Sequence, residues 1–224
     1  MTWPLDHLSA SLIARYRDCP LSALYYRRGE PSSADPRYRV AGSIVHSLIE
    51  REYDPSAEPY SPECPVDDMM QSRIDESMAG YRELRQRGLL PEPSEAVRPE
   101  VYFEAEIGGV PLVGYIDLLY QTETGWRVED WKTGSPRQKD RDQMRIYAYA
   151  LEQTLGARPS ETVATLDYLR LGRREAVPYT SSEAVEDSIV RDVVEPVENL
   201  EFPANRGSRC SMCEYRPICK AWAD

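Results

Sequence analysis

The segment VEDWKTG (residues 128–134) places two ionisable side chains, Asp130 and Lys132, two positions apart on a predicted strand. Successive side chains of a strand point to opposite faces, so these two share one face. An ion pair on a solvated sheet face is the ordinary interpretation of such a pair. A third group, Asp117, lies among apolar residues in LVGYIDLLYQ (112–121), where an ionised carboxylate is costly unless it is paired or binds a cation.

Two acids and a lysine on adjoining strands make a plausible cation site. Mg²⁺ prefers a few carboxylate oxygens and keeps its other positions for water and substrate phosphate. Lys132 is then placed to stabilise a developing phosphate charge or to orient a water nucleophile. The alternative is a buried Asp117 that is simply paired with Lys132, and these residues alone leave both interpretations open.

The cysteines form a second group with ligand chemistry. There are five of them, and no secretory signal is apparent, so a disulfide framework is a poor explanation. Three lie close together in CSMCEYRPIC (210–219), as Cys210-x2-Cys213-x5-Cys219, and need a fourth thiolate from Cys19 or Cys64. Zinc and iron-sulfur clusters both accept four thiolates, so spacing alone leaves the metal open.

Length and composition bound the possibilities. A chain of 224 residues with 41% hydrophobic residues is long enough for one large globular domain. No run approaches the roughly 18 to 20 apolar residues of a membrane span, and no basic stretch precedes an apolar one near the N-terminus, so we expect no membrane association and a cytoplasmic location. A net charge of -11 argues against non-specific coating of nucleic acid but not against a local site. The P-loop pattern of a helicase motor is absent from the chain.

Hydrophobic periodicity predicts helices first, then strands, then both. Two short helices are expected within 9–28, with Asp18 as the N-cap of the second, followed by helices over 41–52 and 70–88. Strands over 98–107, 110–121 and 126–133 are expected to form an antiparallel meander. A helix over 137–155 ending at Gly156, strands over 162–171 and 174–180, and a helix over 182–199 complete the pattern. The predicted fold class is α/β (α+β).

Five segments, in order, resemble those of the RecB-like branch of the PD-(D/E)XK nucleases, which includes the iron-sulfur exonucleases of the AddB type and of CRISPR adaptation modules. The resemblance covers nearly the whole chain. The matching segments are the Cys-Pro helix pair LSASLIARYRDCPLSALYYRRG, the Gly-x-x-x-His helix AGSIVHSLIE, the strand GYID, the Asp-x-Lys segment VEDWKTG and the Gln-x-x-x-Tyr helix QMRIYAYAL.

The resemblance implies a restriction-endonuclease-like core, with a central mixed sheet flanked by helices, and roles for particular residues. His46, Asp117 and Asp130 would bind Mg²⁺ or Mn²⁺, and Lys132 would be catalytic with the two aspartates. Taken alone, His46 is as well explained as an edge residue of an amphipathic helix. Gln143 and Tyr147, four apart on one helix face, would contact substrate, although such pairs are usually ordinary helix surface. An additional acid is expected at Glu100, with Glu104 and Glu106 as competitors.

The resemblance also implies that Cys19 completes the group of Cys210, Cys213 and Cys219 and that the four hold a 4Fe-4S cluster, with Cys64 as the spare. Such a cluster would join 1–30 to 203–224 as an iron-sulfur subdomain within a single nuclease domain, 1–224. Its expected role is mainly structural, since a cross-link over a long loop stabilises by restricting the unfolded chain. A redox role stays open.

The function that the resemblance implies is a metal-dependent DNA nuclease, an exonuclease that acts on single-stranded DNA ends. Recombination repair, CRISPR spacer processing and phage replication are the settings considered, with a helicase or integrase as partner protein. The rival from another class is a non-catalytic DNA-end-binding scaffold subunit. The rival among enzymes is a sequence-specific endonuclease, for which the chain has no separate recognition domain.

Overall fold

The computed structural model describes residues 6–94, 96–179 and 181–222. These residues form two compact units. The described residues of the first unit lie within 1–35, 104–113 and 182–224, and those of the second lie within 36–103 and 114–181. The sequence therefore passes from one unit to the other several times, and the first unit gathers both ends of the described chain.

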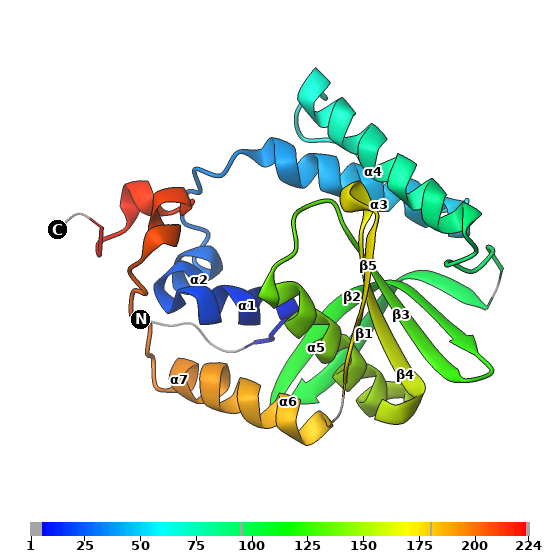
Figure 1. Cartoon of the computed structure of the whole chain (residues 1–224). Coiled ribbons are helices and arrows are strands. Elements are labelled where there is room, and N and C mark those ends of the chain that lie inside the picture. The colour runs from blue at the N-terminus through cyan, green and yellow to red at the C-terminus, as the bar shows by residue number, and fades with distance from the viewer. Residues whose placement is uncertain (1–5, 95, 180, 223–224) are drawn as a thin grey trace. The chain divides into compact units, whose positions relative to one another are not determined.

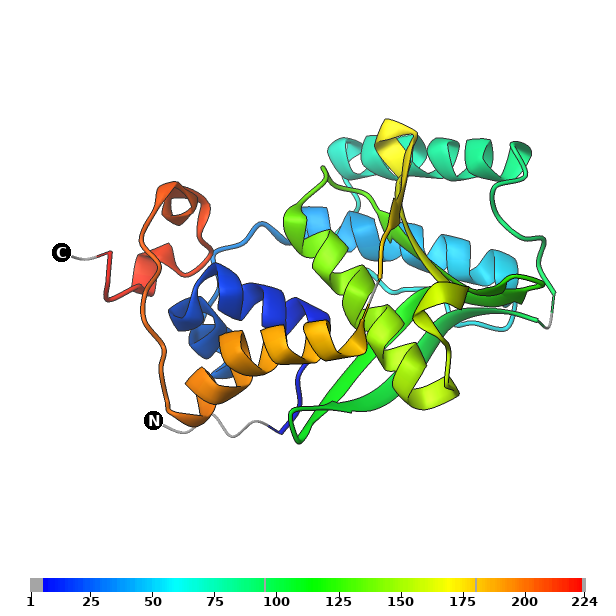
Figure 2. The same ribbon diagram turned by 60° about the horizontal axis from the view of Figure 1, so that its bottom comes forward.

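The first unit is made of short helices. Its elements are α1 (Ala10–Asp18), α2 (Pro20–Arg27), α6 (Ser182–Ile189), a π-helical segment (Val190–Val194), α7 (Glu195–Glu198) and two 3-10 turns (Ser208–Met212 and Arg216–Ile218). The C-terminal segment lies beside α2 in both ribbon views (Figures 1 and 2). The Tyr25 and Tyr215 rings are 5.6 Å apart, and Arg15 pairs with Glu214 at 2.5 Å. These contacts join segments almost 200 positions apart in the sequence.

The second unit holds two long helices, α3 (Pro36–Tyr53) and α4 (Asp68–Gln86), and most of a five-stranded sheet. The strands follow chain order across the sheet: β1 (Val97–Ile107), β2 (Val110–Thr122), β3 (Gly125–Lys132), β4 (Thr162–Tyr168) and β5 (Arg173–Val177). Neighbouring pairs β2–β3 and β4–β5 are antiparallel, whereas β3–β4 is parallel. The sheet is therefore mixed.

The parallel pair explains the long helix between its strands. Parallel neighbours need a crossover connection, and α5 (Gln138–Leu155) supplies it between β3 and β4. The helix ends at Gly156, whose φ of 64° is the left-handed conformation that glycine adopts without steric cost. A 3-10 turn, Leu169–Leu171, then reverses the chain into β5.

The core of the second unit lies between the helix pair and the sheet. Figures 1 and 2 both show α3 and α4 side by side. Val45 and Ile49 of α3, Tyr81 of α4, Leu118 of β2 and Trp131 of β3 belong to one buried cluster. Trp131 packs edge-to-face on Tyr81, with ring centroids 5.9 Å apart. This packing fixes β3 immediately beside the two residues, Asp130 and Lys132, that the sequence marks for chemistry.

Most predicted elements are confirmed, with boundaries shifted by a few residues. The expected N-cap Asp18 is wrong, because Asp18 ends α1 and Cys19 is the N-cap of α2. The strand expected over 162–171 ends at Tyr168, and the strand expected over 174–180 spans Arg173–Val177, while Thr180 lies outside the described residues. The α/β class with a mixed sheet is confirmed. Residues 1–5 and 223–224 of the expected iron-sulfur subdomain are outside the described residues.

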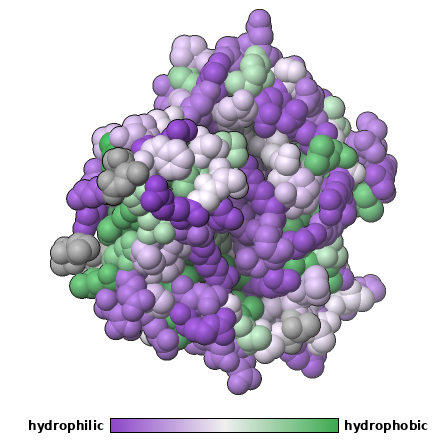
Figure 3. Space-filling model, turned by 60° about the vertical axis from the view of Figure 1, so that its left-hand side comes forward, coloured by the Kyte–Doolittle hydropathy of each residue, from purple (hydrophilic) through white to green (hydrophobic). Residues whose placement is uncertain are grey.

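Hydrophilic residues predominate on the face drawn in Figure 3, with smaller hydrophobic patches between them. Among the described residues, no helix combines the length and apolar character needed to cross a membrane.

Candidate active site

The two aspartates of the predicted site lie just beyond the end of a ladder. The β2–β3 pairing runs from Thr122 opposite Gly125 to Leu118 opposite Glu129, and Asp117 and Asp130 are the next residues on each strand. The Asp117 Oδ2 accepts a 2.7 Å hydrogen bond from the backbone N–H of Trp131. Asp117 is 8% exposed, so this bond satisfies a buried donor and fixes one carboxylate oxygen in place.

His46 approaches the same point from α3. Its Nε2 lies 3.1 Å from the Trp131 carbonyl oxygen, and its Nδ1 lies 3.5 Å from Asp117 Oδ2. If Nε2 carries the proton and donates it to that carbonyl, Nδ1 faces the carboxylate and can bind a cation. Burial pushes the pKa of His46 down, but the charge of Asp117 and its hydrogen bond outweigh burial and raise that pKa well above its usual value. Without a cation, these surroundings favour the imidazolium form, in which both ring nitrogens are protonated.

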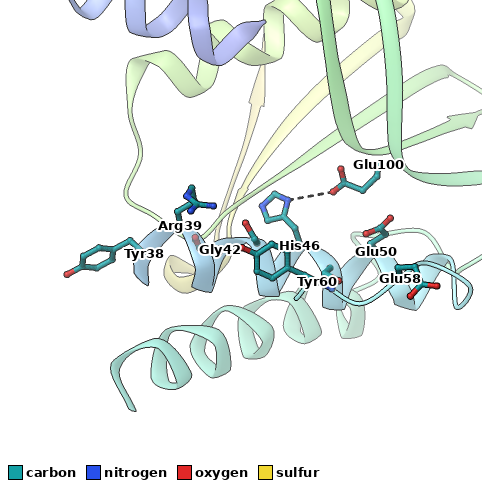
Figure 4. Close-up of a pocket in the computed structure, with 11 residues that line it drawn as sticks. Tyr38, Arg39, Gly42, His46, Glu50, Glu58, Tyr60 and Glu100 are labelled. Carbon is teal, nitrogen blue, oxygen red and sulfur yellow. Dashed lines mark hydrogen bonds and ion pairs between the residues drawn. The ribbon is translucent and has the colours of Figure 1, made fainter. Parts of the chain in front are cut away.

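Glu100 is the third residue that lies near Asp117 and His46, and its backbone conformation is unusual. It lies within β1 with φ of 45°, the left-handed region that non-glycine residues seldom adopt. A left-handed residue inside a strand is typical of a bulge, which re-aims a side chain at a sheet edge. Its Oε1 lies 3.8 Å from His46 Nδ1, as the dashed line in Figure 4 shows. The competitors Glu104 and Glu106 are exposed and lie outside this group.

His46, Glu100 and Asp117 can hold a metal ion together. One ligand atom from each lies within 4.8 Å of the others, and no second group of this kind occurs among the described residues. Two carboxylates and one imidazole suit Mg²⁺ or Mn²⁺, because both prefer oxygen ligands and Mn²⁺ also tolerates nitrogen. The burial of Asp117 adds to this fit, since the charge of a cation compensates a carboxylate that has lost water. The residues present therefore fit a divalent metal.

Asp130 lies next to this group with a different partner. Its carboxylate is 1% exposed, and Oδ2 is 2.6 Å from Lys132 Nζ. Burial raises the pKa of Asp130 to about 7; Lys132 opposes this rise and the charge of Asp117 adds to it. Burial lowers the pKa of Lys132, but Asp130 and Asp117 outweigh it and keep that pKa above its usual value. Lys132 is therefore a cation at neutral pH and not a general base.

Gln143 and Tyr147 of α5 continue a chain of hydrogen bonds that begins at Lys132. Gln143 Oε1 accepts from Lys132 Nζ at 2.8 Å, and Gln143 Nε2 donates to the Tyr147 hydroxyl at 2.6 Å. Tyr147 is 5% exposed, and burial followed by the charges of Asp130 and Asp117 raises its pKa well above the usual value. The expected substrate-facing pair thus forms a chain that orients Lys132, with its tyrosine inside the protein.

A cavity of about 570 Å³ opens on this site along α3. His46 and Glu100 line its middle, and the close-up shows the α3 side chains in a row from Tyr38 to Glu50 (Figure 4). The metal-binding group is therefore open to a substrate from one side, while Asp130 is closed off.

The cysteines lie apart from this site in the sequence and divide between the units. Cys19, Cys210, Cys213 and Cys219 belong to the first unit, and all have free thiols. The backbone N–H of Asn205 donates to Cys19 Sγ at 3.5 Å, and that of Gly207 donates to Cys210 Sγ at 3.4 Å. Burial raises the pKa of Cys213, and the charges of Cys19, Cys219 and Cys210 raise it further. Cys64 belongs to the second unit and packs on the α3–α4 core.

Two features of the candidate site were not predicted from the sequence. The backbone of Trp131 holds both Asp117 and His46, and no side-chain pattern signals a backbone role. The cavity residues Tyr38, Arg39 and Glu50 were not singled out either. Their spacing along α3 was visible as the polar stripe beside His46, and this stripe was the available signal.

The acids at the end of the β2–β3 pairing and the neighbouring lysine combine groups that can hold a divalent cation with a cation that can stabilise negative charge. The family model of the PD-(D/E)XK nuclease superfamily matches residues 7–220. The chain belongs to this superfamily.

Two further similarities bear on the fold and the relatives. Gene 69 protein of Mycobacterium phage D29 is 29% identical over 138 residues, which cover 58% of this chain and 49% of that protein. The chain thus spans about half the length of the curated relative that it matches. The crystal structure of SSO0001 has 17% sequence identity and a TM-score of 0.50, covering 99% of this chain and 89% of that one. At this identity, the similarity concerns the fold alone.

Proposed function

We propose that the chain is a divalent-metal-dependent deoxyribonuclease of the RecB-like branch that degrades single-stranded DNA from an end. The observation that carries the proposal is the group of His46, Glu100 and Asp117 beside the Asp130–Lys132 pair. Membership of the nuclease superfamily supports metal-dependent cleavage of DNA. Asp130 lies next to this group and pairs with Lys132. We propose it as a further metal ligand with His46 and Asp117.

In the proposed hydrolysis, a water oxygen bonds to phosphorus and the bond from phosphorus to the leaving sugar oxygen breaks. The attacking water gives up a proton to solvent, and the departing sugar oxygen takes one up from solvent. A bound cation supplies the positive charge that polarises the phosphodiester and lowers the pKa of water. Lys132, held protonated by Asp130, stabilises the negative charge that grows on the phosphoryl oxygens. Gln143 accepts a hydrogen bond from Lys132 and donates one to Tyr147, so the two residues hold the lysine side chain in one orientation.

The test is digestion of end-labelled linear single-stranded DNA with Mg²⁺ or Mn²⁺ and with a chelator. Metal-dependent release of labelled short products supports the proposal. Binding of ends without any cleavage would favour the rival scaffold function instead. Cleavage confined to one internal sequence would favour a specific endonuclease.

A 4Fe-4S cluster held by Cys19, Cys210, Cys213 and Cys219 is the second part of the proposal. The backbone N–H groups directed at two of the sulfurs support it, since such donors stabilise thiolate ligands. Cys19, Cys219 and Cys210 also lie near enough to Cys213 for their charges to raise its pKa, which supports a shared site. A cubane is wider than a single ion, so its ligands need not converge as those of zinc do. Anaerobic purification with iron and zinc analysis tests the choice; stoichiometric zinc without iron would overturn it.

The setting and partners are also proposals. Similarity to a phage protein, over part of each chain, favours phage replication among recombination repair, CRISPR spacer processing and phage replication. A helicase partner would supply the single strand, because this chain has no P-loop. An integrase partner is the expectation for the CRISPR setting. Co-purification with tagged chain from the source organism, with and without nuclease treatment, identifies a protein partner.

A further inference from the structure

The cavity that opens on the active site is a groove along α3. Its α3 lining includes Tyr38, Arg39, Gly42, His46 and Glu50. From Arg39 onward these positions recur every three or four residues, and Tyr38 precedes Arg39 directly, so they lie along one face of the helix. At 1.5 Å per residue, the row from Tyr38 to Glu50 spans about 18 Å. His46, which also belongs to the candidate metal-binding group, lies between the two ends (Figure 4).

One end of the groove is aromatic and cationic. Tyr38 is 55% exposed, and the Arg73 guanidinium lies 5.0 Å from the centre of its ring. Arg39 is paired with Glu63, but both side chains are half or more exposed to solvent. An exposed pair of this kind contributes little, so a phosphate can replace Glu63 at small cost.

The other end is acidic. Glu50 and Glu58 line the groove beyond His46, with Glu100 alongside. Figure 4 shows Glu50 and Glu58 on the side of His46 away from Tyr38 and Arg39.

The two ends of the groove have opposite effects on the binding of a polynucleotide strand. Every nucleotide carries a phosphate charge and an aromatic base. Bases stack on exposed tyrosines and phosphates bind arginines, so the strand is favoured over Tyr38 and Arg39. A phosphate beyond His46 meets the carboxylates of Glu50 and Glu58 in the groove, and like charges in such a position disfavour binding.

We propose that this charge asymmetry restricts cleavage to strand ends: the strand lies over Tyr38 and Arg39, and Glu50 and Glu58 exclude a chain that continues past the scissile phosphate. The inference rests on the proposed nuclease function and assigns its end specificity to named residues. When an internal segment of DNA binds, its phosphates must occupy both ends of the groove. When a strand terminus binds, only the few nucleotides beyond the scissile phosphate reach the acidic end.

The decisive measurement is the ratio of cleavage rates on circular and linear single-stranded DNA of one sequence and length. The wild-type ratio is expected to be low. The double variant Glu50→Gln/Glu58→Gln should raise the ratio by about tenfold, which corresponds to loss of one unfavourable charge contact. Glu52→Gln is the matched control: Glu52 is an exposed glutamate of α3, about 200° around the helix from Glu50, and should leave the ratio unchanged.

Three results would overturn the inference. Equal wild-type rates on circle and linear strand would remove end specificity while leaving the nuclease function intact. An unchanged ratio in the double variant would assign that specificity elsewhere. A double variant that needs more Mn²⁺ for both substrates would show that the acids bind a cation. Cleavage of neither substrate by the wild type would instead refute the nuclease function, and the inference would fall with it.

Tyr38 tests the favourable end separately. Tyr38→Ala should raise KM for linear DNA by about fivefold to tenfold, since a stacked base is lost, with kcat little affected. Tyr38→Phe keeps the ring and should recover most of the affinity that Tyr38→Ala loses. Equal KM values for all three proteins would show that the strand does not lie over Tyr38.

Discussion

The two chemically distinctive regions of the molecule are organised in opposite ways. In the second unit, Asp117 and Asp130 lie where the β2–β3 pairing ends and Lys132 is the last residue of β3; both aspartates are buried and held by a hydrogen bond or an ion pair. In the first unit, Cys210 lies in the first of two 3-10 turns, and Cys213 and Cys219 each directly follow one of the turns. Of the described residues from 201 to 222, only Tyr215 is buried. The active site is preorganised by the core, whereas the cysteine segment has little core of its own. Segments of this kind commonly depend on a metal or cross-link for stability.

The largest expected effect, a loss of cleavage without a loss of iron, should come from substitution of Asp117 or Asp130. Asp117→Asn or Asp130→Asn is expected to lower kcat by about 10³-fold or more, because metal binding supplies several kcal/mol of transition-state stabilisation. Iron content should be unchanged, since the cysteines belong to the other unit. End-labelled digestion together with iron analysis measures both. Cleavage at the wild-type rate and metal requirement in either variant would contradict the site.

The next effect distinguishes the lysine from the acids. Lys132→Met keeps the aliphatic stem and removes the cation that Asp130 and Gln143 orient. We expect kcat to fall by about 10²-fold to 10³-fold with DNA affinity almost unchanged, because the lysine acts on charge that develops in the transition state. Fluorescence anisotropy with Ca²⁺ and single-turnover cleavage with Mg²⁺ test this. A loss of affinity equal to the loss of rate would make Lys132 a substrate-binding residue.

The cysteines should show the reverse pattern, with stability as the primary loss. Cys19→Ser, or the equivalent change at Cys210, Cys213 or Cys219, is expected to remove the iron and lower stability by about 3 to 5 kcal/mol, the range for losing a cross-link over a long loop. Activity should fall only as folding falls. Melting temperature and iron content are the measurements.

Cys64→Ser is the matched control, because Cys64 is half-buried in the other unit. It should keep its iron and change the melting temperature by only a few degrees. Iron lost from Cys64→Ser and retained in Cys19→Ser would exchange the roles of the two residues.

The smallest effect concerns a buried acid behind the active site. Arg174 binds Glu129 through both carboxylate oxygens at 2.6 Å, and Tyr120 also donates to Glu129. Asp167 shares the same arginine at 3.6 Å and accepts no hydrogen bond among the described residues. Burial raises the pKa of Asp167 to about 6, against the opposing charge of Arg174. One arginine thus serves two acids.

Asp167→Asn should therefore stabilise the protein, and in a pH-dependent way. A carboxyl whose pKa is higher in the folded than in the unfolded state binds protons more readily when folded, so stability falls as pH rises from about 4 to about 6. Asparagine avoids that loss. We expect a gain of about 1 to 2 kcal/mol at pH 8, or roughly 3 to 6 °C in melting temperature, that fades towards pH 4. A gain that is constant with pH would contradict the titration.

Much of the fold was accessible from the sequence, because periodicity depends on short-range geometry. The helix over 137–155 ends at Gly156 as predicted, since glycine at a helix end is a local signal. The Asp-x-Lys pair of β3 also lies as alternation predicts, with both side chains in contact. The parallel pairing of β3 with β4 was not predicted, because it depends on where α5 returns the chain.

The site was only partly accessible, for two physical reasons. Glu100 was a secondary candidate beside Glu104 and Glu106, and a left-handed residue breaks the alternation that would assign its face. In α5, every residue from Ile146 to Leu151 is buried, so no polar stripe shows which way Tyr147 points. Both failures occur where tertiary contacts replace the local pattern.

The backbone of Glu100 has a consequence for the history of the protein. A glycine adopts a φ of 45° without the steric cost that glutamate bears, so Glu100→Gly should keep or slightly raise stability while removing a candidate ligand. Selection for a folded chain alone would accept glycine at this position, whereas selection for cleavage retains the glutamate. The residue at position 100 in any descendant chain therefore indicates which of these pressures has acted on it.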